Sequence, residues 1–555
     1  MGYDLLIKNG MVVDGTGRSR YQANIGVVDG RIAEIGRTID DTAHRVIDAS
    51  DLIVAPGFID PHTHYDAQIC WDPLLTCSSW HGITSVVMGN CGVGIAPCRP
   101  ELHEVVTWDL VNVEGIPFDV LSRGINWEWV SFPQFMQAAE QRGCGVNLAF
   151  LAPLTPFRHF VMGEESMERA ATTEELGQIK ALLREAMLAG AAGFSTTNTL
   201  QHVGFRGRPL ACRLADINEM TAYAGVLKEL GRGLIEIALT RSAGTLSDDE
   251  YQLLDLLLTE SGRPVTWLSA RSEETLRKAD PLIKRGGICQ LRCTPTVFQF
   301  NLKNPALLMA ALSPTWTKVF NLPVETQKKL YASDDFRRGF AADLKRPRAG
   351  GLDWKRVVID QVTSSALRPY EGKSVAEVAA QRAEEPLDSF LNVAIEDELE
   401  TWFVITFAEE ERISRFVADS RLMIGLSDGG AHVSEHCDAN YPTYLLGTWS
   451  RDKQLLTLEH AVKRLTSEPA DLFNLADRGR LAPGMAADFA IFDYDRINSA
   501  PRQHAVRDLP GGGLRFVTAA HGIEYTIVNG EVLFEHQQHT GALPGRLVRP
   551  GNGSH

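Results

Sequence analysis

Two histidines separated by one residue follow an apolar segment, in the stretch PGFIDPHTH at residues 56–64. On a strand, residues i and i+2 project to the same face, so His62 and His64 would present their imidazoles together. Two imidazoles on one face are suitable ligands for a divalent metal such as zinc. Taken alone, the pair is equally compatible with two polar loop histidines that bind no metal. The surrounding secondary-structure elements must decide between these two interpretations.

Those elements alternate along the middle of the chain. Apolar runs predict strands at 83–88, 146–151, 193–195, 234–239, 265–268, 288–291 and 422–426. Helical patterns occupy 173–189, 217–230, 250–261, 374–383 and 458–465. This alternation predicts parallel strands with crossover helices, and ~400 residues fit an eight-stranded barrel with large loop insertions. An open doubly wound sheet is the alternative, although the chain has no glycine-rich dinucleotide fingerprint. The polar stretch 326–348 is predicted to be a solvated excursion.

Both ends of the chain have β-rich patterns. Near the N-terminus, Asn9-Gly10 and Asp29-Gly30 punctuate apolar runs, and Asn529-Gly530 does so near the C-terminus. Such dipeptides favour the tight turns of hairpins. We therefore expect a composite β domain of residues 1–55 plus 481–555, flanking a barrel of residues 56–480.

The charge balance limits the partners that this chain can take. Of its 555 residues, 55 are Lys or Arg and 70 are Asp or Glu, which gives a net charge of −15. This argues against a general nucleic-acid or anionic-membrane binder. No apolar run of ~18 residues and no secretory signal are evident, so we expect a cytoplasmic protein. A homo-oligomer is compatible with this composition, and most of the nine cysteines are expected to be reduced and buried.

PGFIDPHTH followed by HGITSVVMGNCG (residues 81–92) resembles the amidohydrolase superfamily and, within it, the N-acyl-D-amino-acid deacylase (D-aminoacylase) family. The resemblance covers most of the chain and includes VEGIP (113–117), WEW (127–129), RGRLAPG (478–484) and the segment 540–546. It implies a metal-bearing (β/α)8 barrel beside a small β-sandwich made from both termini. The predicted fold class is therefore α/β, a metal-dependent TIM-like barrel with a composite β-sandwich.

The resemblance also implies roles for individual residues. Cys91 would join His62 and His64 as a metal ligand, and a thiolate favours zinc over magnesium or calcium. Asp428, in LSDGGAH (426–432), would be the catalytic acid/base. Metal binding lowers the pKa of water from ~16 towards ~7, and the activated water would attack the amide carbonyl while Asp428 carries the proton to the leaving nitrogen. A buried structural thiol and a turn aspartate are the alternative interpretations.

Departures from the family pattern leave the ligand set open. The best-studied type of D-aminoacylase has a histidine on each of two middle strands, whereas residues 234–239 and 265–271 contain none. His202, His432 and Glu236 are candidates to bind metal or substrate instead. His202 and His432 could equally be loop residues, and Glu236 could pair with a nearby arginine.

Two arginines are candidates to bind a substrate carboxylate, since a guanidinium binds carboxylates in a bidentate manner. Arg158 lies in a family motif from which the preceding histidine is missing, and Arg292 lies in a loop after a strand candidate. A surface salt bridge is the alternative for each.

The predicted function is zinc-dependent hydrolysis of a linear C–N amide bond in a small substrate that can carry a carboxylate, with one or two metal ions. A cyclic-amide hydrolase of the hydantoinase or dihydroorotase kind is the alternative. Those enzymes usually bridge two metals with a carboxylated lysine, and residues 234–239 and 265–268 contain no lysine. A degenerate barrel that binds a ligand without hydrolysis is the third possibility. The retention of the two histidines, the cysteine and the aspartate together argues against it.

Overall fold

The computed structural model describes residues 2–39, 42–239, 245–269, 272–303, 313–319, 322–345, 352–406 and 410–551. The chain divides into two compact units, one made of Met1–Thr294 with Glu411–His555 and the other of Pro295–Glu410. Each unit is described by itself. No helix of the described residues is long and apolar enough to cross a membrane.

An eight-stranded parallel sheet forms the centre of the first unit. Its strands follow chain order: β6 (Phe58–Asp60), β7 (Ile83–Met88), β8 (Asn147–Pro153), β9 (Gly193–Thr197), β10 (Leu234–Ala238), β11 (Val265–Leu268), β12 (Gly287–Leu291) and β16 (Leu422–Ile424). The two outermost strands meet again beyond their ends, where Thr63 forms a parallel bridge with Gly429. This bridge brings the segment that contains His62 and His64 beside the segment that contains Asp428.

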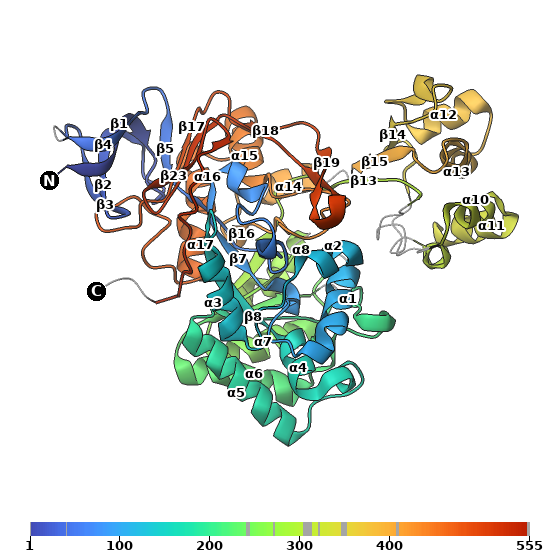
Figure 1. The fold of residues 1–555 in the computed structure, drawn as a ribbon, viewed down its shortest axis with the longest axis horizontal. Helices are drawn as coiled ribbons and strands as arrows, with labels where there is room; N and C mark the ends of the chain where they lie inside the picture. The colour runs from blue at the N-terminus through green and yellow to red at the C-terminus, as the bar shows by residue number, and fades with distance from the viewer. Residues whose placement is uncertain are drawn as a thin grey trace. The chain divides into compact units, whose positions relative to one another are not determined.

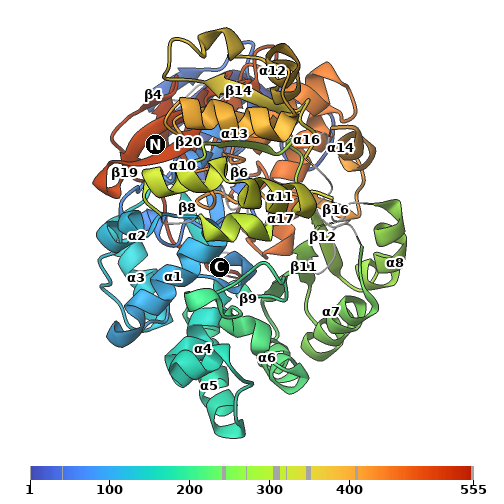
Figure 2. The same ribbon diagram turned by 90° about the vertical axis from the view of Figure 1, so that its right-hand side faces the viewer.

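Helices cover the outer side of this sheet (Figure 2). They include α5 (Thr173–Ala189), α6 (Ile217–Leu230), α7 (Asp248–Ser261) and α8 (Glu273–Ile283). Strands β7 to β10 are buried along their whole length, as expected where both faces of a parallel sheet are covered. The helix boundaries follow local chemistry: α5 begins with a capping box between Thr172 and Glu175 and ends at Gly190, whose φ is +115°.

Strands from both ends of the chain form one nine-stranded sheet. The N-terminal strands are β1 (Tyr3–Val12), β2 (Tyr21–Val28), β3 (Arg31–Gly36), β4 (Ala43–Asp48) and β5 (Ile53–Pro56). The C-terminal strands are β17 (Phe489–Phe492), β22 (Ile523–Val528), β23 (Glu531–Glu535) and β24 (Gln538–His539). Antiparallel pairing of β5 with β17 joins the two groups (Figure 1). The composite sheet is thus present, while a second layer that would make it a sandwich stays a prediction.

One predicted hairpin is wrong. Asn9-Gly10 lies inside the continuous strand β1, where the pairing register with β2 shifts. The Asn9 backbone is left-handed (φ 62°), its N–H donates to Asn24, and its side chain donates to Asp48. Because β1 pairs with β2 on one side and with β4 and β5 on the other, the dipeptide forms a bulge rather than a turn. Asp29-Gly30 and Asn529-Gly530 do link the antiparallel pairs β2–β3 and β22–β23.

The second unit has its own core. Three antiparallel strands, in the order β13 (Val297–Phe300), β15 (Trp402–Thr406) and β14 (Val357–Gln361), lie in one sheet. Its helices include α10 (Val324–Ala332), α11 (Asp334–Asp343), α12 (Val375–Arg382) and α13 (Pro386–Glu396). The expectation of a solvated excursion at 326–348 is wrong for residues 326–345, and 346–348 lie outside the described residues. Tyr331, Phe336 and Phe340 point inward and pack around Trp316, each with its ring centroid 5.3 Å from the indole.

Replacing Trp316 by alanine should destabilise the second unit and leave the stability of the first unit unchanged. Loss of a buried aromatic side chain costs about 3–5 kcal/mol, and Trp316 is fully buried in a core that belongs to this unit. Hydrogen exchange followed by mass spectrometry should show faster exchange in residues 322–345 and unchanged protection in β6 and β7. Leu188→Ala, which removes an exposed side chain, is the control. Equal loss of protection in both units would contradict the two-unit division.

Candidate active site

The three predicted metal donors converge. His62 and His64 follow β6, and Cys91 follows β7. Their donor atoms lie within 4.8 Å of one another, and all three residues are buried. The Cys91 Sγ is 3.4 Å from the His62 Nε2. Across the described ranges, no other group of three such residues comes this close.

Backbone geometry places Cys91 in this cluster. Gly89 has a φ of +79°, and a Cβ there would lie 2.3 Å from the Leu151 carbonyl oxygen, so the turn after β7 requires glycine. Cys91 itself has a φ of 55°. Two neighbouring strands fix the turn, because Cys91 N–H donates to Glu236 Oε2 at 2.6 Å and Gly92 N–H donates to Ser195 Oγ at 2.9 Å. Residues on β9 and β10 therefore position a thiol that follows β7.

Asp428 faces the two histidines from the other end of the sheet. Its Oδ1 is 3.4 Å from His62 Nε2 and 3.8 Å from His64 Nε2. Its Oδ2 accepts a hydrogen bond from Arg292, which also donates to Asp438 at 2.6 Å. Burial alone would raise the pKa of Asp428, but the Arg292 guanidinium and the nearby imidazoles hold that pKa well below its usual range. Asp428 is therefore a carboxylate at neutral pH and able to accept a proton.

A second carboxylic acid that the sequence interpretation did not assign lies beside His64. Glu114 is the last residue of α1 (His103–Glu114), is buried, and places its Oε1 3.2 Å from His64 Nδ1. The backbone carbonyl of Glu114 also accepts a hydrogen bond from His432 N–H at 2.6 Å. The sequence contained a signal, because an acid at the C-terminal end of a helix opposes the helix dipole and needs another reason to be there.

The electrostatics of the cluster fit a bound cation. Burial lowers the pKa of His62 to about 4 and that of His64 well below its ordinary value, so both imidazoles are in the neutral form that ligates metals. Burial raises the pKa of Glu236 to about 8 and those of Glu114 and Cys91 well above their ordinary values. A nearby positive charge would favour the ionised form of these three acids.

Unpaired polar atoms point to the same conclusion. The Nδ1 of His62 and the Oε1 of Glu236 are buried without a hydrogen-bond partner, and the Nδ1 of His64 and the Oε1 of Glu114 face each other at 3.2 Å without forming a hydrogen bond. Each such atom costs about 1–3 kcal/mol if it stays unsatisfied. Two imidazoles and one thiol are a typical zinc donor set, and three protein ligands leave a fourth position for water or substrate. The residues present therefore fit zinc.

The remaining histidine candidates lie near Asp428, outside the three-donor group. Burial lowers the pKa of His202 to about 4 and that of His432 to about 3, and the Asp428 charge opposes both shifts. His432 and His436 do not lie on a helix, but the His436 N–H donates to the His432 carbonyl and the ring centroids are 5.3 Å apart. His436 Nδ1 is 3.3 Å from Asp438.

Arg158 lies in a different environment from the one expected. It is fully buried on α4 (Leu154–Met162), and its guanidinium pairs with Glu219. It also donates to three backbone carbonyls, those of Ala211, Ser166 and Arg169. A guanidinium whose hydrogen-bonding capacity is used in this way is a structural ion pair, so the expectation that Arg158 binds substrate finds no support in its contacts.

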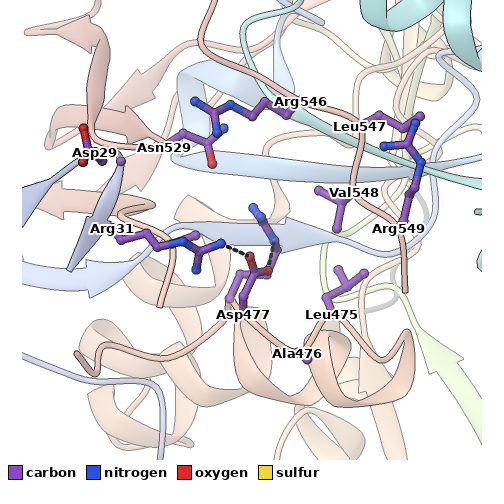
Figure 3. A pocket seen from close by; sticks show the side chains of 13 residues that line it. Asp29, Arg31, Leu475, Ala476, Asp477, Asn529, Arg546, Leu547, Val548 and Arg549 are labelled. Atoms are coloured by element: carbon purple, nitrogen blue, oxygen red, sulfur yellow. Dashed lines mark hydrogen bonds and ion pairs between the residues drawn. The ribbon is translucent and has the colours of Figure 1, made fainter. Parts of the chain in front are cut away.

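A cavity of about 180 Å³ elsewhere in the first unit contains none of the predicted site residues (Figure 3). Of the four arginines that line it, three have acidic partners: Arg31 is 3.3 Å from Asp477, Arg478 is 2.6 Å from Asp488, and Arg549 is 3.3 Å from Glu140. The lining charges are thus largely neutralised, and the converged donors near Asp428 remain the candidate active site.

Comparison with known proteins places this site in a family. The model of the amidohydrolase family matches residues 45–287 and 349–534, so the chain belongs to the amidohydrolase family, as its sequence motifs predict. D-aminoacylase of Alcaligenes xylosoxydans xylosoxydans is 28% identical, with 98% of this chain and 97% of that protein covered. N-acyl-D-glutamate deacylase of the same organism is 29% identical, with 98% and 96% covered.

A solved structure shows the same likeness. The N-acyl-D-glutamate deacylase of Bordetella bronchiseptica, complexed with zinc and a phosphonate inhibitor that mimics the tetrahedral intermediate, is 26% identical with a TM-score of 0.66. The alignment covers 99% of this chain and 100% of that one. A D-hydantoinase from a Thermus species is more distant, at 16% identity and a TM-score of 0.51, and shows the fold alone.

Replacing Cys91 by serine should remove most of the bound zinc, because a neutral hydroxyl replaces the thiolate donor. Glu236→Gln keeps an acceptor for the Cys91 N–H but removes a carboxylate from the cluster, and we expect it to weaken zinc binding by about 10–100-fold. Inductively coupled plasma mass spectrometry after dialysis against a graded chelator measures both effects. The control is Cys144→Ser, a buried cysteine outside the cluster. Full zinc retention in Cys91→Ser would refute the donor assignment.

Replacing Arg158 by leucine should destabilise the first unit by about 3–5 kcal/mol, because Glu219 would remain buried without its cation. The matched control is Arg184→Leu, which removes an ion pair between Arg184 and Glu229 on the surface. These two side chains are 43% and 50% exposed, so the change should lower the free energy of unfolding by less than about 1 kcal/mol. Urea unfolding measures both. If Arg158→Leu kept wild-type stability, the structural assignment would fail.

Proposed function

We propose that this protein is a zinc-dependent amidohydrolase that cleaves the linear amide bond of N-acyl amino acids. The observation that supports it best is the meeting of His62, His64 and Cys91 with an ionised carboxylate, Asp428, at the same edge of the sheet. Relatives named as a D-aminoacylase and as N-acyl-D-glutamate and N-acyl-D-aspartate deacylases support a D-amino acid as the substrate moiety.

In this proposal His62, His64 and Cys91 hold the metal. When bound, zinc supplies a Lewis acid that polarises the amide carbonyl and lowers the pKa of water. Asp428 Oδ2 is held by Arg292, and Oδ1 faces the histidines, so Oδ1 is the oxygen that accepts the proton of the attacking water. The protonated Asp428 then donates to the leaving nitrogen, and Arg292 favours its return to the carboxylate.

Two acids take over positioning in the absence of the middle-strand histidines. Glu236 fixes the turn that carries Cys91, and Glu114 lies where it can orient the His64 ring, since carboxylate–histidine contacts orient metal ligands. His202 and His432 lie around Asp428 and are proposed to bind a second ion or the substrate. Arg292 keeps its proposed contact with the substrate carboxylate only if it can release Asp438.

The architecture proposed with this function has two parts. The eight parallel strands would form a (β/α)8 barrel within residues 56–480, and residues 1–55 with 481–555 would form a β-sandwich. The Thr63–Gly429 bridge and the β5–β17 pairing support these boundaries. A cyclic-amide substrate is less well supported, because the hydantoinase structures are only 13–16% identical. The cytoplasmic location and the homo-oligomer stay predictions.

Replacing Asp428 by asparagine should lower kcat by about 10²–10⁴-fold, because the amide cannot accept the proton, while the zinc content is unchanged. The matched control is Asp477→Asn, since Asp477 lines the cavity of Figure 3 and also forms an ion pair with an arginine. The Asp477 side chain is 17% exposed, and that of Asp428 is 14% exposed. A ninhydrin assay of released amino acid on N-acetyl-D- and N-acetyl-L-amino acids measures turnover, with hydantoin as the cyclic alternative. Unchanged turnover in Asp428→Asn, or activity on hydantoin alone, would refute the proposal.

A further inference from the structure

Two cysteines distant in the sequence lie in contact near the active site. Cys77 immediately precedes the short helix η2 (Ser78–His81), and Cys437 belongs to the segment after β16. Their sulfur atoms are 3.0 Å apart.

The two thiols differ in their access to solvent. Cys77 is 3% exposed, whereas Cys437 is partly exposed. Both line a small hollow of about 20 Å³ that also borders Asp428 and His436. A volume of this size holds one water-sized molecule. Cys437 is therefore the thiol of the pair that is open to solvent, and Cys77 is in contact with it.

Each cysteine is connected to the candidate active site through the residue that follows it in the chain. Cys437 precedes Asp438, which binds Arg292, and Arg292 in turn binds Asp428. On the other side, Cys77 precedes Ser78, whose hydroxyl is 2.7 Å from the Tyr65 hydroxyl.

Tyr65 packs closely against the segment that follows Asp428. A Cβ on Gly429 would lie 2.8 Å from the Tyr65 Oη, and one on Gly430 would lie 2.9 Å from its ring. Both glycines therefore lie in direct contact with Tyr65. A covalent link between the two cysteines would therefore connect the segment of His64 with the segment of Asp428.

We propose that Cys77 and Cys437 are a peroxide-sensitive pair that closes into a reversible disulfide and slows the enzyme. One of the two sulfurs, as the thiolate, attacks hydrogen peroxide, the O–O bond breaks, hydroxide leaves, and a sulfenic acid forms. The other sulfur then attacks the sulfenic sulfur, so that the S–S bond forms as the S–O bond breaks and water leaves. One peroxide is reduced to two waters while two thiols are oxidised, and a dithiol reductant reverses the change.

The consequence for turnover, which rests on the proposed function, is geometric. A disulfide bond measures about 2.05 Å, so closure from the observed 3.0 Å brings the two sulfur atoms about 1 Å closer and pulls on the segments that carry them. A displacement of ~1 Å in an active site can cost up to about 10²-fold in rate. We expect the oxidised enzyme to turn over about tenfold more slowly, with no loss of zinc.

The test uses the zinc-loaded full-length protein. After treatment with micromolar hydrogen peroxide, free thiols are blocked with iodoacetamide and the protein is digested without reductant. Mass spectrometry should find one peptide pair that links Cys77 to Cys437, two hydrogens lighter than the separate peptides and absent after dithiothreitol. The amidohydrolase rate is measured on the same samples.

Three variants complete the experiment. Cys77→Ser and Cys437→Ser should each abolish the linked peptide and the reversible part of the inhibition, so the test survives if one of them does not fold. Cys70→Ser, which removes another partly exposed cysteine, should behave as wild type. Absence of the linked peptide overturns the proposal, and so does a linked form whose turnover stays within twofold. If the protein hydrolyses no amide, the peptide result still tests the pair, so the two proposals fail separately.

Discussion

Two imidazoles, a thiol and a carboxylate lie close together where β6, β7 and β16 end, and the site depends on the balance of their charges. Asp428 stays ionised because Arg292 binds one of its oxygens. His62 and His64 stay neutral because burial penalises the imidazolium form. The same burial keeps Cys91 and Glu236 protonated unless a cation is near, so a bound cation would shift both groups towards their ionised forms.

The departures from the relatives acquire a physical meaning in this setting. The middle strands lack the histidines that the best-studied type of D-aminoacylase carries there, and β10 contributes Glu236 to the centre of the sheet instead. Glu236 acts on the candidate metal donor Cys91 by accepting a hydrogen bond from the Cys91 backbone N–H, not by contacting the Cys91 side chain. A carboxylate that positions Cys91 thus stands where the relatives carry a histidine. The site is held together differently, but His62, His64 and Cys91 are still present as candidate donors.

Local patterns predicted many elements well, and the exceptions show what such patterns omit. The helices Thr173–Ala189 and Ile217–Leu230 have their predicted ends because capping residues and glycines mark them within the sequence. Asn9-Gly10 predicted a turn that is absent, because a β-bulge and a turn both use a residue in the left-handed conformation. Only the strands that pair with β1 decide between the two. The sequence of helices α10 and α11 predicted a solvated segment because charged residues on their outer faces outnumber the three aromatic residues that point inward.

The sequence by itself determined the family and the parallel alternation of strands and helices. It also indicated His62, His64 and Cys91 as candidate metal donors and Asp428 as the candidate acid/base, because each of these lies in a short motif of neighbouring residues. Only the tertiary structure decided the rest, because it depends on contacts between distant segments. Glu114 reaches His64 from the end of a helix, and Arg292 binds Asp428 from 136 positions away. Burial and charge pairing, which set the ionisation of these groups, are properties of the folded arrangement and not of any single motif.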